Sequence, residues 1–369
     1  MSPLMQLTPE NIYRFLHKRQ LIDNDAVVKG NFMVIPANTR NTILKIMIEK
    51  DNSLFAKQME KDPVSVSQFQ REINAYALFK NNTEFSTLAH LVPDMLDYDD
   101  ENNILITRLL PDAKNLSEYY MLTKNFDLAL PREQAHILSA CHVVPDVKTD
   151  TSGFPKILPW VLRLHQFRAT DFFVGNQAST EIIQLIKDNS VLQNALIDLA
   201  NSWQYTHLIH GDIKWINFLV TTNDTNQLTQ KLIDWELADI GDPLWDVAGL
   251  LQSYISIWVL GFDNANPYSN TLPDYMKPFD MRELQPSAEA FLKEYITLQG
   301  YPTEYHPYFY DKVMRLTAAR IIQTSVEATT FNSKIEANYM RCIQLAYNIM
   351  KDPMTALDEL FTIKSFHHV

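Results

Sequence analysis

The sequence predicts an α+β protein in two parts, a small β-rich first part and a larger α-helical second part. Short apolar runs bounded by polar turns dominate the first hundred residues. After residue 110 the apolar spacing becomes helical, with one short hairpin inserted. The chain has 369 residues, of which 46% are hydrophobic, and this is enough for a substantial core.

Strands are expected at 31–36, 43–49, 54–57 and 104–107. In the second of these, Leu44, Ile46 and Ile48 alternate with Lys45 and Glu49, the pattern of a half-buried strand. The segment 36–42 is polar and turn-like, and 97–103 is rich in turn residues.

The period then changes to that of a helix. Phe69, Ile73, Tyr76 and Ala77 fall at i, i+4, i+7 and i+8, with Ser65 or Ser67 as the expected cap. Further helices are expected at 131–143, 179–188, 191–205 and from 246 onward, and strands at 218–220 and 231–234. Two late stripes are expected to be core: Met314, Ala318, Ile321 and Ile322, then Tyr339, Ile343, Ala346, Tyr347 and Met350.

Composition excludes several classes of function. A net charge of −12 argues against a nucleic-acid partner and is compatible with a cationic substrate. The longest apolar stretch, 247–262, is interrupted by polar residues and is shorter than a bilayer crossing needs. The first residues lack a secretory signal, and two cysteines fit a reducing compartment. We therefore expect a cytoplasmic protein without a membrane partner.

The segment His210–Asn217, HGDIKWIN, carries the residue types that phosphoryl transfer needs. Such transfer requires an acceptor for the hydroxyl proton and oxygen ligands for Mg²⁺. Asp212 is expected to orient and deprotonate the hydroxyl, and Asn217 to offer its amide oxygen to the metal. Asp234, expected at the end of an apolar strand, is a second candidate ligand.

These two segments together resemble a known family. HGDIKWIN resembles the His-Gly-Asp-x-x-x-x-Asn loop of aminoglycoside phosphotransferases and choline-kinase-like enzymes. IDWELADIGDPLWDVA resembles their Ile-Asp-Trp-Glu…Gly-Asp-Pro-x-x-Asp-x-Ala segment. The resemblance implies a bilobal protein-kinase-like fold, with an N-lobe at 1–106, a hinge at 107–111 and a C-lobe at 112–369.

The resemblance also implies roles for individual residues. Asp212 matches the catalytic base, and Asn217 and Asp234 match the Mg²⁺ ligands, with Glu236 as a further residue on the metal side. His210 and Asp246 match positions that brace the catalytic loop. Lys214 stands where a cation can neutralise the migrating phosphoryl group.

The nucleotide side is expected in the first part. Lys57 resembles the strand lysine that contacts the nucleotide phosphates, and Glu72 resembles its helical partner; Lys45 is the competing lysine. The backbone of Thr107, Arg108, Leu109 and Leu110 is expected to meet the base of ATP, with GTP as an alternative.

One departure from protein kinases is the phosphate loop, because 35–42 contains no glycine. Backbone amides of Asn38, Thr39, Arg40 and Asn41 are expected to form an anion nest instead, and Arg40 to reach a phosphate directly.

Three functions remain open from the sequence. The first is a kinase of a hydroxyl on a small molecule, such as an aminoglycoside, a choline-like amine or a sugar. The second is a Ser/Thr kinase of a precursor peptide in lanthipeptide biosynthesis, working beside biosynthetic partner proteins. The third is a non-catalytic binding module. Candidate acceptor residues lie in two regions: Trp160, Arg163, His165, Arg168, Phe172 and Phe173, then Trp258, Asp263, Tyr268, Asp274, Tyr275, Glu283 and Glu289.

Overall fold

In the computed structural model the chain divides into two compact units that interleave along the sequence. Unit 1 comprises Met1–Asn115, Asp146–Phe154 and Asn217–Ala238, and unit 2 comprises Leu116–Pro145, Pro155–Ile216 and Asp239–Val369. The structure describes residues 5–28, 32–38, 40–48, 52–166, 177–222, 225, 227–261 and 279–364. The lobe boundaries and the hinge at 107–111 stay predictions.

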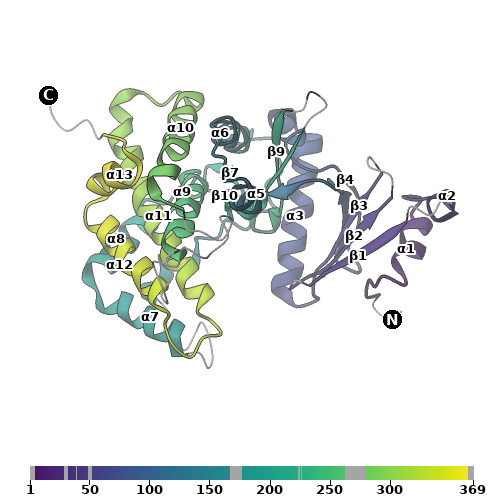
Figure 1. Ribbon diagram of the computed structural model, residues 1–369, viewed down its shortest axis with the longest axis horizontal. Helices are drawn as coiled ribbons and strands as arrows, with labels where there is room; N and C mark the ends of the chain where they lie inside the picture. The colour runs from purple at the N-terminus through teal and green to yellow at the C-terminus, as the bar shows by residue number, and fades with distance from the viewer. Residues whose placement is uncertain are drawn as a thin grey trace. The chain divides into compact units, whose positions relative to one another are not determined.

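Unit 1 is built on a five-stranded antiparallel sheet with the order β1-β2-β3-β5-β4 (Figure 1). The strands are β1 (Met33–Asn38), β2 (Thr42–Met47), β3 (Leu54–Gln58), β4 (Met95–Asp99) and β5 (Ile104–Arg108). Four of them correspond to the expected strands, whose outermost residues 31 and 49 lie outside the described residues. Strand β4 overlaps 97–103, so the turn prediction was wrong at 97–99. As an edge strand it pairs only with β5, and its half-exposed side chains show no clear alternation.

One face of this sheet packs into a hydrophobic core, and the other faces a cavity. Alternate side chains such as Leu44, Leu54 and Ile104 pack against helix α1 (Ile12–Lys18) in one hydrophobic cluster. The strand register places Ile43, Lys57 and Leu105 in a row, on the opposite face from that cluster. Successive side chains of a strand point to opposite faces, so the side chains of the first face form the core and those of the second line a cavity.

Helix α3 (Pro63–Asn81) belongs to this second face (Figure 1). Its cap is Asp62, whose carboxylate accepts from the amides of Val64 and Ser65, with a proline at the first helical position. The expected serine caps were therefore wrong by about one turn. The side chains that set the period, including Phe69 and Ile73, are buried. The remaining short helices of the unit are α2 (Asp25–Val28), η1 (Thr83–Phe85) and α4 (Ser86–Ala89).

A second, three-stranded sheet completes unit 1, with β8 (Phe218–Thr222) between β6 (Lys114–Asn115) and β9 (Leu228–Leu232). The hairpin predicted at 218–220 and 231–234 is thus present, but its second strand ends at residue 232. A short helix, η5 (Trp235–Leu237), follows at once. Trp235 packs edge-to-face on Phe79 of α3, with ring centroids 4.7 Å apart, and this contact fixes the chain after β9.

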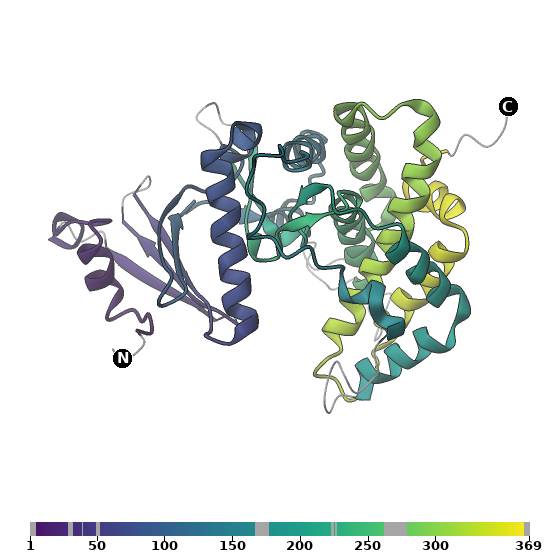
Figure 2. The same cartoon turned by 180° about the vertical axis from the view of Figure 1, so that it is seen from behind.

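Unit 2 is mainly helical (Figure 2). Its longer helices are α5 (Leu116–Thr123), α6 (Ala129–Cys141), α7 (Gln177–Asp188), α8 (Ser190–Asn201), α9 (Leu244–Leu260), α10 (Met281–Gln299), α11 (His306–Ala328), α12 (Ala337–Lys351) and α13 (Pro353–Phe361). Shorter elements are η2 (Trp160–Gln166), η4 (Trp215–Asn217, whose last residue is assigned to unit 1), η7 (Thr303–Tyr305) and the antiparallel pair β7 (His207–Ile209) and β10 (Asp239–Gly241). The helices expected at 131–143, 179–188 and 191–205 are α6, α7 and α8. Together with the sheets of unit 1, they confirm the predicted α+β class.

Helices α9 and α11 form the centre of unit 2, and α11 also packs against α12. The predicted stripe from Met314 to Ile322 is buried, as are Ile343, Ala346 and Met350 of the second stripe. Cys141 and Cys342 are both buried and free. Among the described residues, no helix combines the length and the hydropathy that a bilayer crossing requires.

Candidate active site

A cavity of about 320 Å³ lies within unit 1. Of the residues expected on the nucleotide side, Arg40, Asn41, Lys57, Glu72, Thr107, Arg108, Leu109 and Leu110 line it, together with the two acidic residues Asp234 and Glu236. Sequence reasoning missed the other apolar walls, which are Ile43, Phe55, Tyr76, Pro93, Leu105, Leu219 and Ile233. These side chains belong to segments far apart in the chain, so only the tertiary fold of unit 1 brings them together.

The ammonium group of Lys57 is surrounded by three carboxylates. Its Nζ lies 2.9 Å from Glu72 Oε2, 2.6 Å from Asp234 Oδ1 and 2.9 Å from Glu236 Oε2. Burial by itself lowers the pKa of Lys57, but the three carboxylates outweigh it and hold that pKa well above its usual value. Lys57 is therefore a fixed positive charge on the cavity wall. Lys45, the competing lysine, is exposed.

The same cluster carries more negative than positive charge. Burial raises the pKa of Glu72 to about 6, even though Lys57 acts in the opposite direction. The carboxylate oxygens of Glu72, Asp234 and Glu236 all lie within 4.8 Å of one another. Hard oxygen ligands at this spacing suit Mg²⁺, so the side chains present fit that ion.

The local backbone positions the two expected metal ligands. The carbonyl oxygen of Asn217 accepts from the amide of Ile233 at 2.9 Å, beside the turn that carries Asp234. Asp234 itself adopts the left-handed conformation, with φ 70° and ψ 59°, instead of ending a strand as predicted. A non-glycine residue held there costs on the order of 1–3 kcal/mol, and such strain persists where the surroundings fix it. Here Trp235, which is fully buried, follows it directly.

The glycine-free loop is described only in part. The guanidinium of Arg40 donates to Gln68 Oε1 of α3 at 2.7 Å, so the arginine side chain spans from the loop to the helix. Thr39 and the side chain of Asn38 lie outside the described residues, so the anion nest stays a prediction.

The expected hinge backbone is partly engaged already. The amide of Arg108 donates to Asp94 O at 2.8 Å, and the amide of Leu109 donates to Ser53 O at 2.9 Å. In this arrangement these two N–H groups are not offered to a ligand, although both residues line the cavity.

In unit 2, the carboxylate of Asp212 lies between two cations. Its Oδ2 is 2.6 Å from Lys214 Nζ, and its Oδ1 is 3.5 Å from an Nη of Arg320. The two cations differ in burial, because the side chain of Lys214 is 38% exposed and that of Arg320 only 4%. Sequence reasoning missed Arg320. The available signal was a charged residue between Ala319 and Ile321 in an otherwise apolar stripe, since a buried charge requires partners.

The backbone before Asp212 is held by a fully buried carboxylate. Asp246, in the first turn of α9, accepts from the amide of His210 at 2.6 Å and from the amide of Gly211 at 2.9 Å. Gly211 has φ 81°, which glycine adopts without strain. Burial raises the pKa of Asp246, but the hydrogen bond and the charge of His142 and the contacts with His210 outweigh it, so this pKa is lowered.

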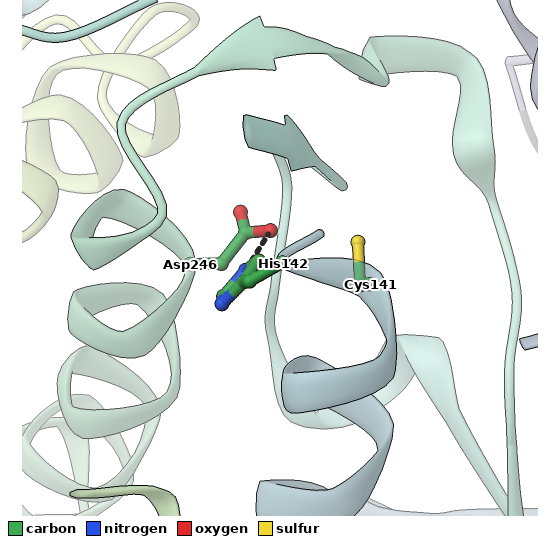
Figure 3. A group of neighbouring side chains, drawn as sticks. All are labelled: Cys141, His142 and Asp246. Carbon is green, nitrogen blue, oxygen red and sulfur yellow. Dashed lines mark hydrogen bonds and ion pairs between the residues drawn. The ribbon is translucent and has the colours of Figure 1, made fainter. Parts of the chain in front are cut away.

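Cys141, His142 and Asp246 form a buried group that resembles a metal site in composition (Figure 3). Its atoms are otherwise occupied: His142 Nε2 lies 3.2 Å from Asp246, and Nδ1 lies 2.7 Å from the hydroxyl of Tyr295. Burial raises the pKa of Cys141 well above its usual value, which keeps the sulfur a thiol, whereas a metal binds the thiolate. The group is therefore a hydrogen-bonded brace between α6, α9 and α10.

Most of the candidate acceptor residues have local partners or fall outside the described residues. Glu283 closes the capping box of α10, Glu289 pairs with Lys293, and the indole of Trp160 donates to Glu327. Arg168, Phe172, Phe173, Asp263, Tyr268, Asp274 and Tyr275 lie outside the described residues.

Comparison with known proteins identifies the family and agrees with this fold. The model of the phosphotransferase enzyme family matches residues 32–284. No curated protein matches the chain by sequence. The fold is similar to choline kinase from Cryptosporidium parvum Iowa II, with a TM-score of 0.58 and 15% identity over 95% of this chain and 97% of that one. It is also similar to an APH(2″)-type enzyme solved with GDP and kanamycin (TM-score 0.52, 16% identity, 91% and 98% covered). A second such enzyme, solved with ATP and streptomycin, gives a TM-score of 0.50 at 17% identity, with 88% and 91% covered. The expected kinase-like fold is confirmed.

Proposed function

Because the chain belongs to the phosphotransferase enzyme family, we propose that it transfers the γ-phosphoryl group of Mg²⁺–ATP to a hydroxyl group of a small, amine-bearing molecule. The observation that carries this proposal is the ion-pair cluster of Lys57, Asp234 and Glu236 on the wall of the cavity in unit 1. A fixed ammonium beside hard oxygen ligands is what a nucleotide triphosphate and its metal ion require.

The residues of unit 1 take the nucleotide side. Glu72 holds Lys57 in place, and Lys57 exchanges its contacts with Asp234 and Glu236 for phosphate oxygens. Asp234, Glu236 and the amide oxygen of Asn217 would hold Mg²⁺, and the bound ion would neutralise charge on the phosphates. The apolar side chains of the cavity suit the flat face of a nucleotide base. ATP is the proposed donor, and GTP is the alternative, since the relatives are solved with ATP and with GDP.

The residues of unit 2 take the acceptor side. Asp212 accepts the proton of the attacking hydroxyl, and this requires Lys214 to leave Oδ2. The exposed Lys214 side chain is free to turn toward the transferring phosphoryl group, where its charge favours the transition state. His210 and Asp246 keep the loop in the conformation that presents Asp212.

An amine-bearing acceptor is supported by charge. The chain carries a net charge of −12, which attracts a cation over long range. The solved relatives named above include a choline kinase and enzymes solved with kanamycin and with streptomycin. Choline, kanamycin and streptomycin are all cationic molecules. A Ser/Thr-containing peptide, as in lanthipeptide maturation, is the competing acceptor, and no contact among the described residues favours it.

The proposal is tested by incubating the purified protein with Mg²⁺ and γ-labelled ATP or GTP. The acceptors are choline, ethanolamine, kanamycin, streptomycin, an uncharged sugar and a Ser/Thr-rich peptide. Label is expected on a hydroxyl group of one of the amine-bearing acceptors. The control variant Asp358→Asn, which changes an exposed carboxylate on α13, should retain full transfer. Label on the peptide alone would replace the proposed acceptor class. An absence of both transfer and nucleotide binding would overturn the kinase itself in favour of a non-catalytic module.

A further inference from the structure

We propose that Arg320 of α11 is a positioning residue that holds the catalytic loop around Asp212; this rests on the proposed function of that loop. Arg320 occupies a core position, with a side chain only 4% exposed. A guanidinium is rarely buried so deeply unless its donors are used.

The donors of Arg320 reach both sides of Asp212. One Nη lies 2.9 Å from the carbonyl oxygen of Ile213, and the other lies 3.3 Å from the carbonyl oxygen of Gly211. These are the residues directly before and after the proposed base. A single side chain therefore fixes the peptide groups on each side of Asp212, and its charge lies 3.5 Å from Oδ1.

Trp245 of α9 supports this arrangement. Its ring packs under the guanidinium, with Cζ of Arg320 4.9 Å from the ring centroid. Its indole nitrogen donates to the carbonyl oxygen of Gly211 at 3.0 Å, so that oxygen receives hydrogen bonds from both side chains. The next residue, Asp246, accepts the amides of His210 and Gly211. Asp246 thus fixes the N–H groups of His210 and Gly211, while Arg320 and Trp245 fix the carbonyl groups of Gly211 and Ile213.

The shape of arginine matters here as well as its charge. The two terminal nitrogens of the planar guanidinium contact two carbonyl oxygens and one carboxylate oxygen. The single nitrogen of a lysine side chain cannot reproduce this geometry. Lys214 cannot take over this role either, because it is exposed and the proposed mechanism turns it toward the phosphoryl group. Arg320 is the cation that stays beside Asp212 throughout the reaction.

The test compares Arg320→Met and Arg320→Lys with the matched control Arg315→Met. Arg315 lies on the same helix, but it contacts Asp311 and the carbonyl oxygen of Met350, away from the loop. We expect turnover of Arg320→Met to fall by about 10²-fold, the scale of a misplaced catalytic group. Arg320→Lys should recover only part of that loss. The dissociation constant for Mg²⁺–ATP should stay unchanged in all three variants, because unit 1 residues line the cavity.

Hydrogen exchange of the loop peptide gives a second readout that needs no turnover. In Arg320→Met the amides of residues 210–213 should exchange at least about tenfold faster than in the wild type, and in Arg315→Met at the wild-type rate. Unchanged loop exchange in Arg320→Met, or an equal loss of turnover in Arg315→Met, would overturn the positioning role. If the wild type transfers no phosphoryl group, the proposed function fails, and the exchange comparison still decides whether Arg320 holds the loop.

Discussion

Gly249 of α9 has no room for a side chain, and this makes it a sensitive probe of the catalytic loop. A Cβ built at this position would lie 2.5 Å from the carbonyl oxygen of Ile213, 3.2 Å from its Cβ and 3.3 Å from an Nη of Arg320. The substitution Gly249→Ala therefore pushes directly on the peptide group that follows Asp212.

The magnitude follows from these distances. Ordinary contact begins at 3.4 Å, so the carbonyl oxygen at 2.5 Å must move by the difference, 0.9 Å. Overpacking of this kind costs about 1–3 kcal/mol, while replacing a helical glycine by alanine recovers about 1 kcal/mol. Stability should therefore fall by about 2 kcal/mol at most. A displacement of about 1 Å at a catalytic group costs up to about 10²-fold in rate, so activity should suffer far more than stability.

The assay measures turnover with the best acceptor, together with the midpoint of urea unfolding. Gly300→Ala is the control, because Gly300 has φ 64° with no atom within 4 Å of an added Cβ. That variant should lose about 1–2 kcal/mol through backbone strain and keep wild-type turnover. Wild-type turnover in Gly249→Ala, or a loss no larger than in Gly300→Ala, would refute the close approach of α9 to the loop.

Three further predictions concern the charged groups. Lys57→Met should lower transfer by at least about 10²-fold. The same variant should bind Mn²⁺ more tightly in the absence of nucleotide, because Lys57 no longer competes for Asp234 and Glu236. Mn²⁺ binding is measured by electron paramagnetic resonance, and weaker binding would contradict the competition. Asp234→Ala should remove the Mg²⁺ dependence of ATP binding in calorimetry, and a retained dependence would exclude Asp234 as a ligand. The lowered pKa of Asp246 means that its stabilising contribution is present above the ordinary aspartate pKa of 3.8 and is lost as the pH falls. The stability advantage of the wild type over Asp246→Asn should accordingly shrink on acidification in urea unfolding, and a constant or growing advantage would contradict it.

The parts of the fold that local pattern determines were predictable from the sequence. The alternation in β2 and the helical period in α3 gave the right elements, because burial of one face governs both. The edge strand β4 was missed because pairing with β5 alone imposes no alternation on its side chains. The cap of α3 was misplaced because Asp62 precedes a proline at the first helical position and takes the role that Ser65 or Ser67 was expected to fill.

The candidate site also contains features that local sequence predicts and features that it does not. Asp212, Asn217 and Asp234 could be predicted as candidate site residues because their spacing is local and typical of the chemistry. The conformation of Asp234 was not predictable, since the packing of Trp235 on Phe79 helps to set it. Arg320 was missed for a similar reason. It lies more than a hundred residues from the loop in the sequence, and only the packing of the helices brings the two together. Contacts of this range depend on the tertiary fold, and no short window of sequence records them.

The central claim, that Asp212 is the base of a Mg²⁺–nucleotide phosphotransferase, is tested most directly by Asp212→Asn. Transfer of label from γ-labelled ATP and the dissociation constant of Mg²⁺–ATP would be measured on the same preparation. We predict that transfer falls by about 10²-fold or more while the dissociation constant stays at its wild-type value. Full transfer by Asp212→Asn would contradict the assignment of the base, and a parallel loss of ATP binding would contradict the separation of the base from the nucleotide cavity.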